Sequence, residues 1–197
     1  MASDQKKAQA LKATVAFLDE CGILMAPVTR RTWAPSGKTP VLRQVGRSHT
    51  KVSVIGAICA RPGRGAKTRV RAYFRLYLQK NIDAAKCREF LRQLLGNIHG
   101  PLIVVWDRLN AHRSVKVRKF VESMNGRLQL EYFPPYAPEL NPIEYGWAYL
   151  KGHVLANHAP KDSDDLFTSA KRGICKTRRR KDVLRGCIDH AKLYFFD

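Results

Sequence analysis

Acidic residues are scarce in this chain of 197 residues. Asp and Glu number 16 against 36 Lys and Arg, which gives a formal net charge of +20 and a sequence pI near 10.2. The excess runs through the chain instead of sitting in one tail, and it favours a polyanionic partner such as nucleic acid. A ribosome-type protein would share this charge without an acidic site, and a membrane-surface protein would need an amphipathic basic helix.

Long apolar runs and paired cysteines are also lacking. No stretch approaches the roughly 18 apolar residues of a membrane span, and the first residues, Met-Ala-Ser-Asp-Gln-Lys-Lys, lack the apolar core of a signal peptide. The five cysteines are odd in number and far apart, with no Cys-x-x-Cys pair. We therefore expect a soluble, cytoplasmic protein with buried thiols and no membrane partner.

The order of the predicted elements indicates an α/β fold. With 45% hydrophobic residues the chain is long enough for a sizeable core, and we expect a single domain over residues 1–197. Three or four antiparallel strands come first, at 14–19 and 22–28 as a hairpin, then at 52–60 and 69–78. Further strands are expected at 102–106 and 128–133, and helices at 83–98, 114–124, 164–174 and 182–195. This order predicts a ribonuclease-H-like mixed sheet with helices on both faces.

Two acids stand out because each follows an apolar strand. Asp19 ends the run that starts at Thr14, and Asp107 directly follows Leu-Ile-Val-Val-Trp. An ionised carboxylate at the end of a buried strand is costly unless something compensates it, and ligands of α/β sheets bind at that edge. Taken alone, each acid is more simply explained as a turn or helix-capping residue.

A third acid, Glu144, follows a segment rich in proline. Asn141 is a candidate N-cap, Pro142 suits the first helical position and Glu144 falls at the third, so a capping box explains this pattern locally. It leaves unexplained the three prolines that stiffen the approach to the helix, Pro134, Pro135 and Pro138. A rigid approach is what a positioned catalytic acid needs.

Asp19, Asp107 and Glu144 together would form a site for Mg²⁺ or Mn²⁺, because hard carboxylate oxygens bind such ions. Two ions roughly 3.5–4 Å apart activate the attacking oxygen and stabilise the leaving one in an in-line displacement at phosphorus. Acid-free basic stretches would then bind the DNA backbone, although such runs are often only solvated faces. The candidates are Arg61, Arg64, Lys67, Arg69 and Arg71 in one stretch, and Arg178, Arg179, Arg180 and Lys181 in another.

Four motifs carry a family resemblance. They are Leu18-Asp19-Glu20, the segment Arg-Thr-Trp-Ala-Pro-Ser-Gly at 31–37, Val-Trp-Asp-Arg-Leu-Asn-Ala-His at 105–112, and Pro-Pro-Tyr-Ala-Pro-Glu-Leu-Asn-Pro-Ile-Glu at 134–144. Together they resemble the DDE transposase catalytic domain of the mariner superfamily, particularly its bacterial insertion-sequence branch, over residues 12 to 152. The 36 residues between Asp107 and Glu144 are close to the spacing of that family.

The resemblance implies roles for individual residues. Asp19, Asp107 and Glu144 would be the catalytic triad. Asp19 is preferred over its neighbour Glu20 because alternation along a strand points the two to opposite faces, so only one can join the site. Asn110, His112 and Asn141 match positions that would support the site or orient the DNA, although His112 is equally well explained as a cap or packing residue.

The resemblance also implies a reaction and its partners. The reaction is Mg²⁺-dependent hydrolysis at transposon ends, followed by attack of the freed 3′-OH on target DNA, with a homodimer as the working form. An N-terminal helix-turn-helix module is expected to be absent, since the first predicted strand begins near residue 14; either the chain is a fragment of a longer protein, or a partner chain supplies DNA recognition. Two alternatives stay open: a ribonuclease-H-like nuclease or resolvase without strand transfer, and an inactive DNA-binding transposon remnant.

Overall fold

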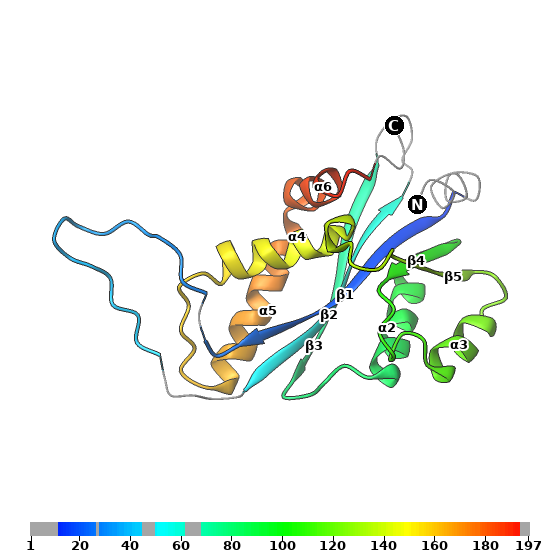
Figure 1. Cartoon of the computed structure of the whole chain (residues 1–197), viewed down its shortest axis with the longest axis horizontal. Helices are drawn as coiled ribbons and strands as arrows, with labels where there is room; N and C mark the ends of the chain where they lie inside the picture. Colours follow the sequence, from blue (N-terminus) through cyan, green and yellow to red (C-terminus); the bar gives the residue numbers. More distant parts are fainter. Residues whose placement is uncertain (1–11, 27, 45–49, 62–67, 194–197) are drawn as a thin grey trace.

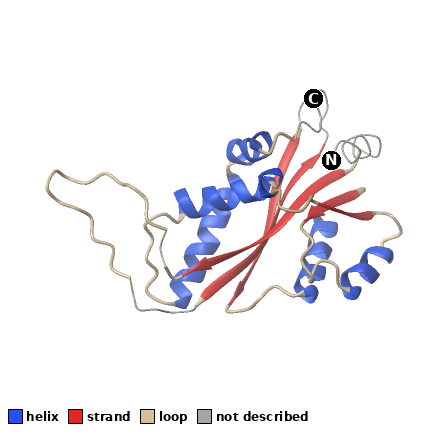
Figure 2. Ribbon diagram, in the orientation of Figure 1, coloured by secondary structure: helices blue, strands red, loops and turns tan. Residues whose placement is uncertain are grey.

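A five-stranded mixed sheet in the order β3-β2-β1-β4-β5 forms the centre of the computed structural model, which describes residues 12–26, 28–44, 50–61 and 68–193 (Figure 1, Figure 2). The first three strands are antiparallel neighbours, and β4 and β5 run parallel to β1. The predicted mixed sheet is thereby confirmed. The strands are β1 (Thr14–Leu24), β2 (Lys51–Arg61), β3 (Arg69–Leu78), β4 (Leu102–Trp106) and β5 (Leu128–Tyr132).

Helices cover both faces of the sheet, as predicted (Figure 1). On one face lie α2 (Ala84–Asn97) and α3 (Val115–Glu122). On the other lie α4 (Pro142–Tyr149), α5 (Ser163–Arg179) and α6 (Lys181–His190), with the short elements η1 (Pro138–Leu140) and η2 (Leu150–Val154) flanking α4. The helix α5 runs past the predicted end at residue 174, because Thr177 continues its buried stripe. No described helix is long and apolar enough to span a membrane.

The hairpin predicted at 14–28 is wrong, because β1 is one continuous strand. Its pairing with β2 runs without a break from Val15↔Ala60 to Leu24↔Lys51. The polar residues and Gly22 suggested a turn, but Cys21 and Ile23 remain buried at alternate positions, which keeps the strand on the core. Asp19 therefore lies inside a strand and not at its end.

Because β4 is short, the part of β1 that carries Asp19 has no paired β4 residue beside it. Parallel pairing of β1 with β4 covers only the positions from Thr14↔Leu102 to Phe17↔Val105, and β4 ends at Trp106. Asp107 is the next residue after that end. The register thus brings Asp19 and Asp107 to the carboxyl edge of β4, where ligands bind in α/β sheets.

A long segment, residues 28–44, extends away from the body of the protein (Figure 1). Its base is fixed by Asn157, whose side chain accepts a hydrogen bond from the N–H of Arg30 (2.8 Å) and donates one to the carbonyl of the same residue (2.9 Å). The predicted motif at 31–37 lies in this segment, and Trp33 within it is fully exposed. The motif is therefore remote from the sheet core.

Gly56 on β2 allows α4 to pack closely against the sheet. In the register of β1 and β2 it lies opposite Asp19. A Cβ atom at this position would lie 2.7 Å from Phe74 Cδ1, 2.7 Å from Trp147 Cη2 and 2.9 Å from Ile143 Cδ1. The missing side chain therefore makes room for Trp147 of α4 next to Asp19.

Gly56→Ala should lower the free energy of unfolding by about 1–3 kcal/mol, the usual cost of overpacking a filled core. The matched control is Gly22→Ala on β1, where a Cβ atom would meet nothing within 4 Å. Urea denaturation of both variants measures the difference. An equal loss of stability in the two would contradict the packing argument.

Candidate active site

Asp19, Asp107 and Glu144 line one cleft at the carboxyl edge of β4. The first comes from β1, the second from the turn after β4, and the third from the first turn of α4. The segment 133–138, with its three prolines, forms another wall of the cleft, and Asn141 also lines it. The structure thus brings together the three acids that the sequence singled out.

Asp19 is held by a hydrogen bond from α4. Trp147 Nε1 donates to Asp19 Oδ2 at 3.0 Å. Burial, together with the nearby charges of Glu144 and Glu20, raises the pKa of Asp19 to about 7. The carboxylates of this cleft therefore repel one another, and a bound cation would relieve that repulsion.

The raised pKa predicts a pH dependence of stability in the metal-free protein. Asp19 contributes stability that is fully present below its ordinary pKa of 3.8 and is lost as the pH rises through about 7. Asp19→Asn, which keeps an acceptor for Trp147, should therefore melt above the parent at pH 8 in EDTA. The advantage should shrink as the pH falls toward 4. A difference in melting temperature that stays constant with pH would contradict this.

Asp107 is fixed by two donors. Its Oδ1 accepts from the backbone N–H of Leu109 at 3.0 Å and from His112 Nδ1 at 2.7 Å. Burial alone would raise the pKa of Asp107, but the bonds from His112 and Leu109 outweigh it and hold the pKa below its usual range. Asp107 is therefore ionised over the physiological range, in contrast to Asp19.

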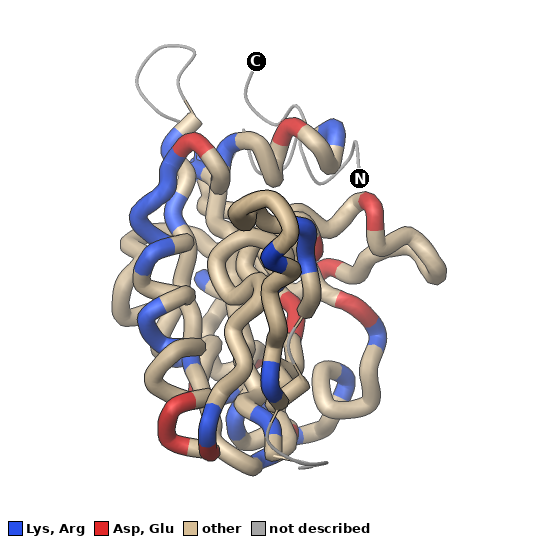
Figure 3. Tube along the Cα trace, turned by 90° about the vertical axis from the view of Figure 1, so that its left-hand side faces the viewer, with Lys and Arg blue, Asp and Glu red and all other residues tan. Residues whose placement is uncertain are grey.

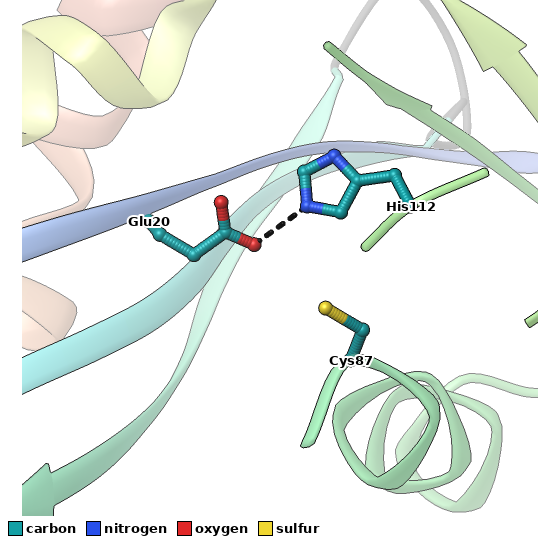
Figure 4. A group of neighbouring side chains, drawn as sticks. All are labelled: Glu20, Cys87 and His112. Carbon is teal, nitrogen blue, oxygen red and sulfur yellow. Dashed lines mark hydrogen bonds and ion pairs between the residues drawn. The ribbon is translucent and has the colours of Figure 1, made fainter. Parts of the chain in front are cut away.

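His112 links Asp107 to Glu20, and Figure 4 shows its contact with Glu20. His112 is only 2% exposed, and its ring stacks on Trp106, with ring centroids 4.0 Å apart and planes at 10°. Nε2 lies 2.8 Å from Glu20 Oε1, so both ring nitrogens face carboxylates and both carry a proton. Burial alone would lower the pKa of His112, but the hydrogen bonds to its neighbours, that to Asp107 first, raise it to about 12.

Asn141 caps α4 without help from Glu144. Its Oδ1 accepts from the N–H of Ile143 at 3.4 Å, and its Nδ2 donates to the carbonyl of Leu18 at 3.2 Å, which ties the helix to β1. In a capping box Glu144 would accept from the N–H of Asn141, but that N–H donates to the carbonyl of Pro138 at 2.9 Å. In the described part of the chain the Glu144 carboxylate makes no hydrogen bond, and it is exposed to the cleft.

The remaining predicted residues lie outside this cleft. Asn110 is exposed in the turn that leads to His112. Arg61, Arg69 and Arg71 line a separate pocket at the far end of β2 and β3. Arg178, Arg179 and Lys181 are exposed, whereas Arg180 Nη2 pairs with Asp182 at 2.6 Å. Along the backbone drawn in Figure 3, Lys and Arg clearly outnumber Asp and Glu. Arg64 and Lys67 lie outside the described residues.

Sequence reasoning missed the contact between Glu20 and His112, because it set Glu20 aside on the ground that only one of two neighbouring acids can face the cleft. Alternation does direct Asp19 to α4 and Glu20 to the opposite face. On that face Glu20 meets His112, which is 92 residues away in the chain. No local pattern signals such a pair.

The sheet order, the helices on both faces and the acidic cleft at the edge of β4 define a ribonuclease-H-like domain. Residues 14–167 match the family described as DDE superfamily endonuclease. The chain belongs to this family.

Solved structures of the Mos1 mariner transposase share the fold. The chain superimposes on the Mos1 paired end complex with Mg with a TM-score of 0.65 at 17% identity, covering 98% of this chain and 57% of that one. For the Mos1 catalytic domain alone the TM-score is 0.57 at 15% identity, and the coverage of that chain rises to 85%. The chain thus spans little more than half of the Mos1 chain in the paired end complex.

A bacterial protein also matches in sequence. The uncharacterized protein y4pE/y4sA of Sinorhizobium fredii is 29% identical over 115 residues, which are 58% of this chain and 76% of that protein.

Proposed function

We propose that the chain is the catalytic domain of a DNA transposase, which cleaves DNA at transposon ends and joins the freed 3′-OH to target DNA by in-line phosphoryl transfer. The observation that supports this most directly is the convergence of Asp19, Asp107 and Glu144 on one cleft in a chain of the DDE superfamily. The net charge of +20 supports DNA as the partner. The proposed catalytic residues are these three acids.

Their chemistry fits divalent metal. The three carboxylates offer hard oxygen donors in one cleft, and burial together with the charge of Glu144 raises the pKa of Asp19, so a bound cation would relieve part of the cost of ionising it. We propose that they hold two Mg²⁺ or Mn²⁺ ions, and Mos1 has been solved with each metal. Bound ions would supply Lewis-acid activation of the attacking oxygen and stabilise the leaving one.

The protein's own contribution is to orient the acids. Trp147 fixes the carboxylate of Asp19, and the N–H of Leu109 fixes that of Asp107. Glu144 stands on a helix whose start is tied to β1 by Asn141. Ligands held on such supports keep the productive geometry without rearrangement during the reaction.

The pocket of Arg61, Arg69 and Arg71 is the proposed contact with the DNA backbone at the far end of the sheet. Arg61 and Arg69 are direct cross-strand partners, and like charges in that position destabilise a sheet. None of the three pairs with a carboxylate in the described ranges, whereas Arg75 on the same face of β3 bonds Glu89 at 2.6 Å. A phosphodiester would supply the missing negative charge. The exposed residues Arg178, Arg179 and Lys181 are proposed as further backbone contacts.

Replacing Arg69 and Arg71 together by Ala should weaken DNA binding and reduce the slope of log K against log salt by about 2, since each phosphate contact adds roughly 0.9 to the slope. Fluorescence anisotropy over a salt series measures this. The control is the double variant Lys116→Ala, Lys119→Ala on α3, which removes the same charge from exposed positions. Equal slopes in the two double variants would contradict a specific contact.

A joining assay tests the function itself. The protein is incubated with Mn²⁺, a linear DNA that carries the ends of its element, and a supercoiled target plasmid. Joined products are expected. Cuts without joining would point to a nuclease or resolvase, and neither product would point to an inactive remnant. We further propose that two copies act together, because the Mos1 complexes hold paired ends; sedimentation with and without DNA measures this.

A further inference from the structure

Glu20 and His112 form a partly buried chain of hydrogen bonds that ends on Asp107. Figure 4 shows the bond between Glu20 and His112. Glu20 projects from β1 on the face opposite to Asp19, and its Oε1 accepts from His112 Nε2 at 2.8 Å. The other ring nitrogen donates to Asp107 Oδ1 at 2.7 Å. Glu20 therefore reaches the edge of the cleft through His112, without lining the cleft itself.

The His112 ring has little freedom to turn. It is almost completely buried, and it stacks on Trp106, the last residue of β4. A histidine in such a position is oriented by the partner of its second nitrogen. Here that partner is Glu20, so the direction in which Nδ1 points toward Asp107 depends on a residue from another strand.

A metal site at this cluster is the competing interpretation. The possible ligand atoms of Glu20, Cys87 and His112 lie within 4.8 Å of one another. However, both nitrogens of His112 already face carboxylate oxygens at hydrogen-bonding distance, so the ring has no lone pair free for an ion. The contacts fit a chain of donors and acceptors better than a coordination sphere.

We propose that Glu20 is a positioning residue for the reaction: it fixes the His112 ring, and His112 fixes the Asp107 carboxylate at the cleft. This inference rests on the proposed function, because it assumes that Asp107 binds metal. Partners that orient a ligand from outside the coordination sphere typically contribute 10–100-fold to metal affinity or activity. Losing Glu20 should therefore weaken metal binding although the three cleft acids stay in place.

Two variants of Glu20 separate positioning from direct ligation. Glu20→Ala should raise the dissociation constant for Mn²⁺, followed by electron paramagnetic resonance, by about tenfold or more. It should also slow cleavage at saturating Mn²⁺. Glu20→Gln should restore both to near the parent values, because its amide oxygen can accept from Nε2–H while Nδ1–H still donates to Asp107. A neutral amide would not rescue a directly ligating carboxylate.

Controls keep the test independent of folding. Glu122→Ala on α3 removes a carboxylate from an exposed position and should bind Mn²⁺ and cleave like the parent. Where Glu20→Ala does not fold, Glu20→Asp takes its place: it keeps the charge but is one methylene shorter, so it should show the same defect.

Three outcomes would overturn the inference. Normal Mn²⁺ affinity and cleavage in Glu20→Ala or Glu20→Asp, with an inactive Asp107→Asn, would remove the positioning role and leave the proposed function standing. Normal cleavage by Asp107→Asn would overturn both the positioning role of Glu20 and the proposed function. Thiolate–Co²⁺ absorption in the parent that is absent in Cys87→Ser would show that the cluster is a metal site.

Discussion

Asp107→Asn should abolish DNA cleavage with Mg²⁺ or Mn²⁺ and leave DNA affinity unchanged or slightly higher. The substitution removes a charged metal ligand and a negative charge beside the phosphates. An asparagine oxygen can still accept from Leu109 N–H and His112 Nδ1, so the turn after β4 should keep its shape. Cleavage of labelled DNA and a binding titration measure the two properties.

The control for this prediction is Asp189→Asn on α6, the same chemical change at an exposed position. It should cleave like the parent. Asp107 would be only a turn residue if its Asn variant cut DNA at the parent rate with the parent metal dependence.

The regular elements could be predicted because their patterns are local. The buried run Leu102–Trp106 and the amphipathic segment of α2 indicated a strand and a helix directly, and their order indicated a mixed sheet. β1 could not be read in the same way, since Gly22 and its polar neighbours suggest a turn. The pairing with β2 that keeps the strand straight becomes visible only in three dimensions.

The candidate site, too, could be predicted only where the signal is local in the sequence. Scarcity of acids and the proline-rich approach drew attention to Asp19, Asp107 and Glu144. Two contacts of the site join residues that are far apart in the sequence, and no local pattern indicated them. They are the contact of Glu20 with His112 and that of Trp147 with Asp19. Runs of basic residues were also insufficient to predict individual DNA contacts, because one member of such a run, Arg180, is paired with an acid in the structure.

Glu144 is the acid for which a purely structural role was the strongest alternative, and the cap geometry weakens that alternative. Asn141 caps α4 with its own side chain, and its N–H is taken by the carbonyl of Pro138. Glu144→Gln should therefore leave the helix intact. At most it should lose roughly 0.3–1 kcal/mol from the missing charge near the helix dipole.

Catalysis and metal binding should respond quite differently to Glu144→Gln. The charge of Glu144 helps to raise the pKa of Asp19, so its removal relieves repulsion in the metal-free cleft. The variant should melt at or above the parent temperature in EDTA. It should lose the stabilisation that Mn²⁺ gives the parent, because a ligand stabilises only as far as it binds the folded state. It should also show no strand cleavage.

Glu139→Gln, five residues earlier in η1, is the matched comparison for Glu144→Gln. Glu139 is exposed, and its side chain does not line the cleft, so this variant should keep both the Mn²⁺-dependent rise in melting temperature and the cleavage activity. Retained cleavage by a well-folded Glu144→Gln protein would exclude Glu144 from the site. If the Glu139→Gln variant were then the inactive one, the third acid would have to reach the metals from η1, and the segment 133–138 would have to move to admit it.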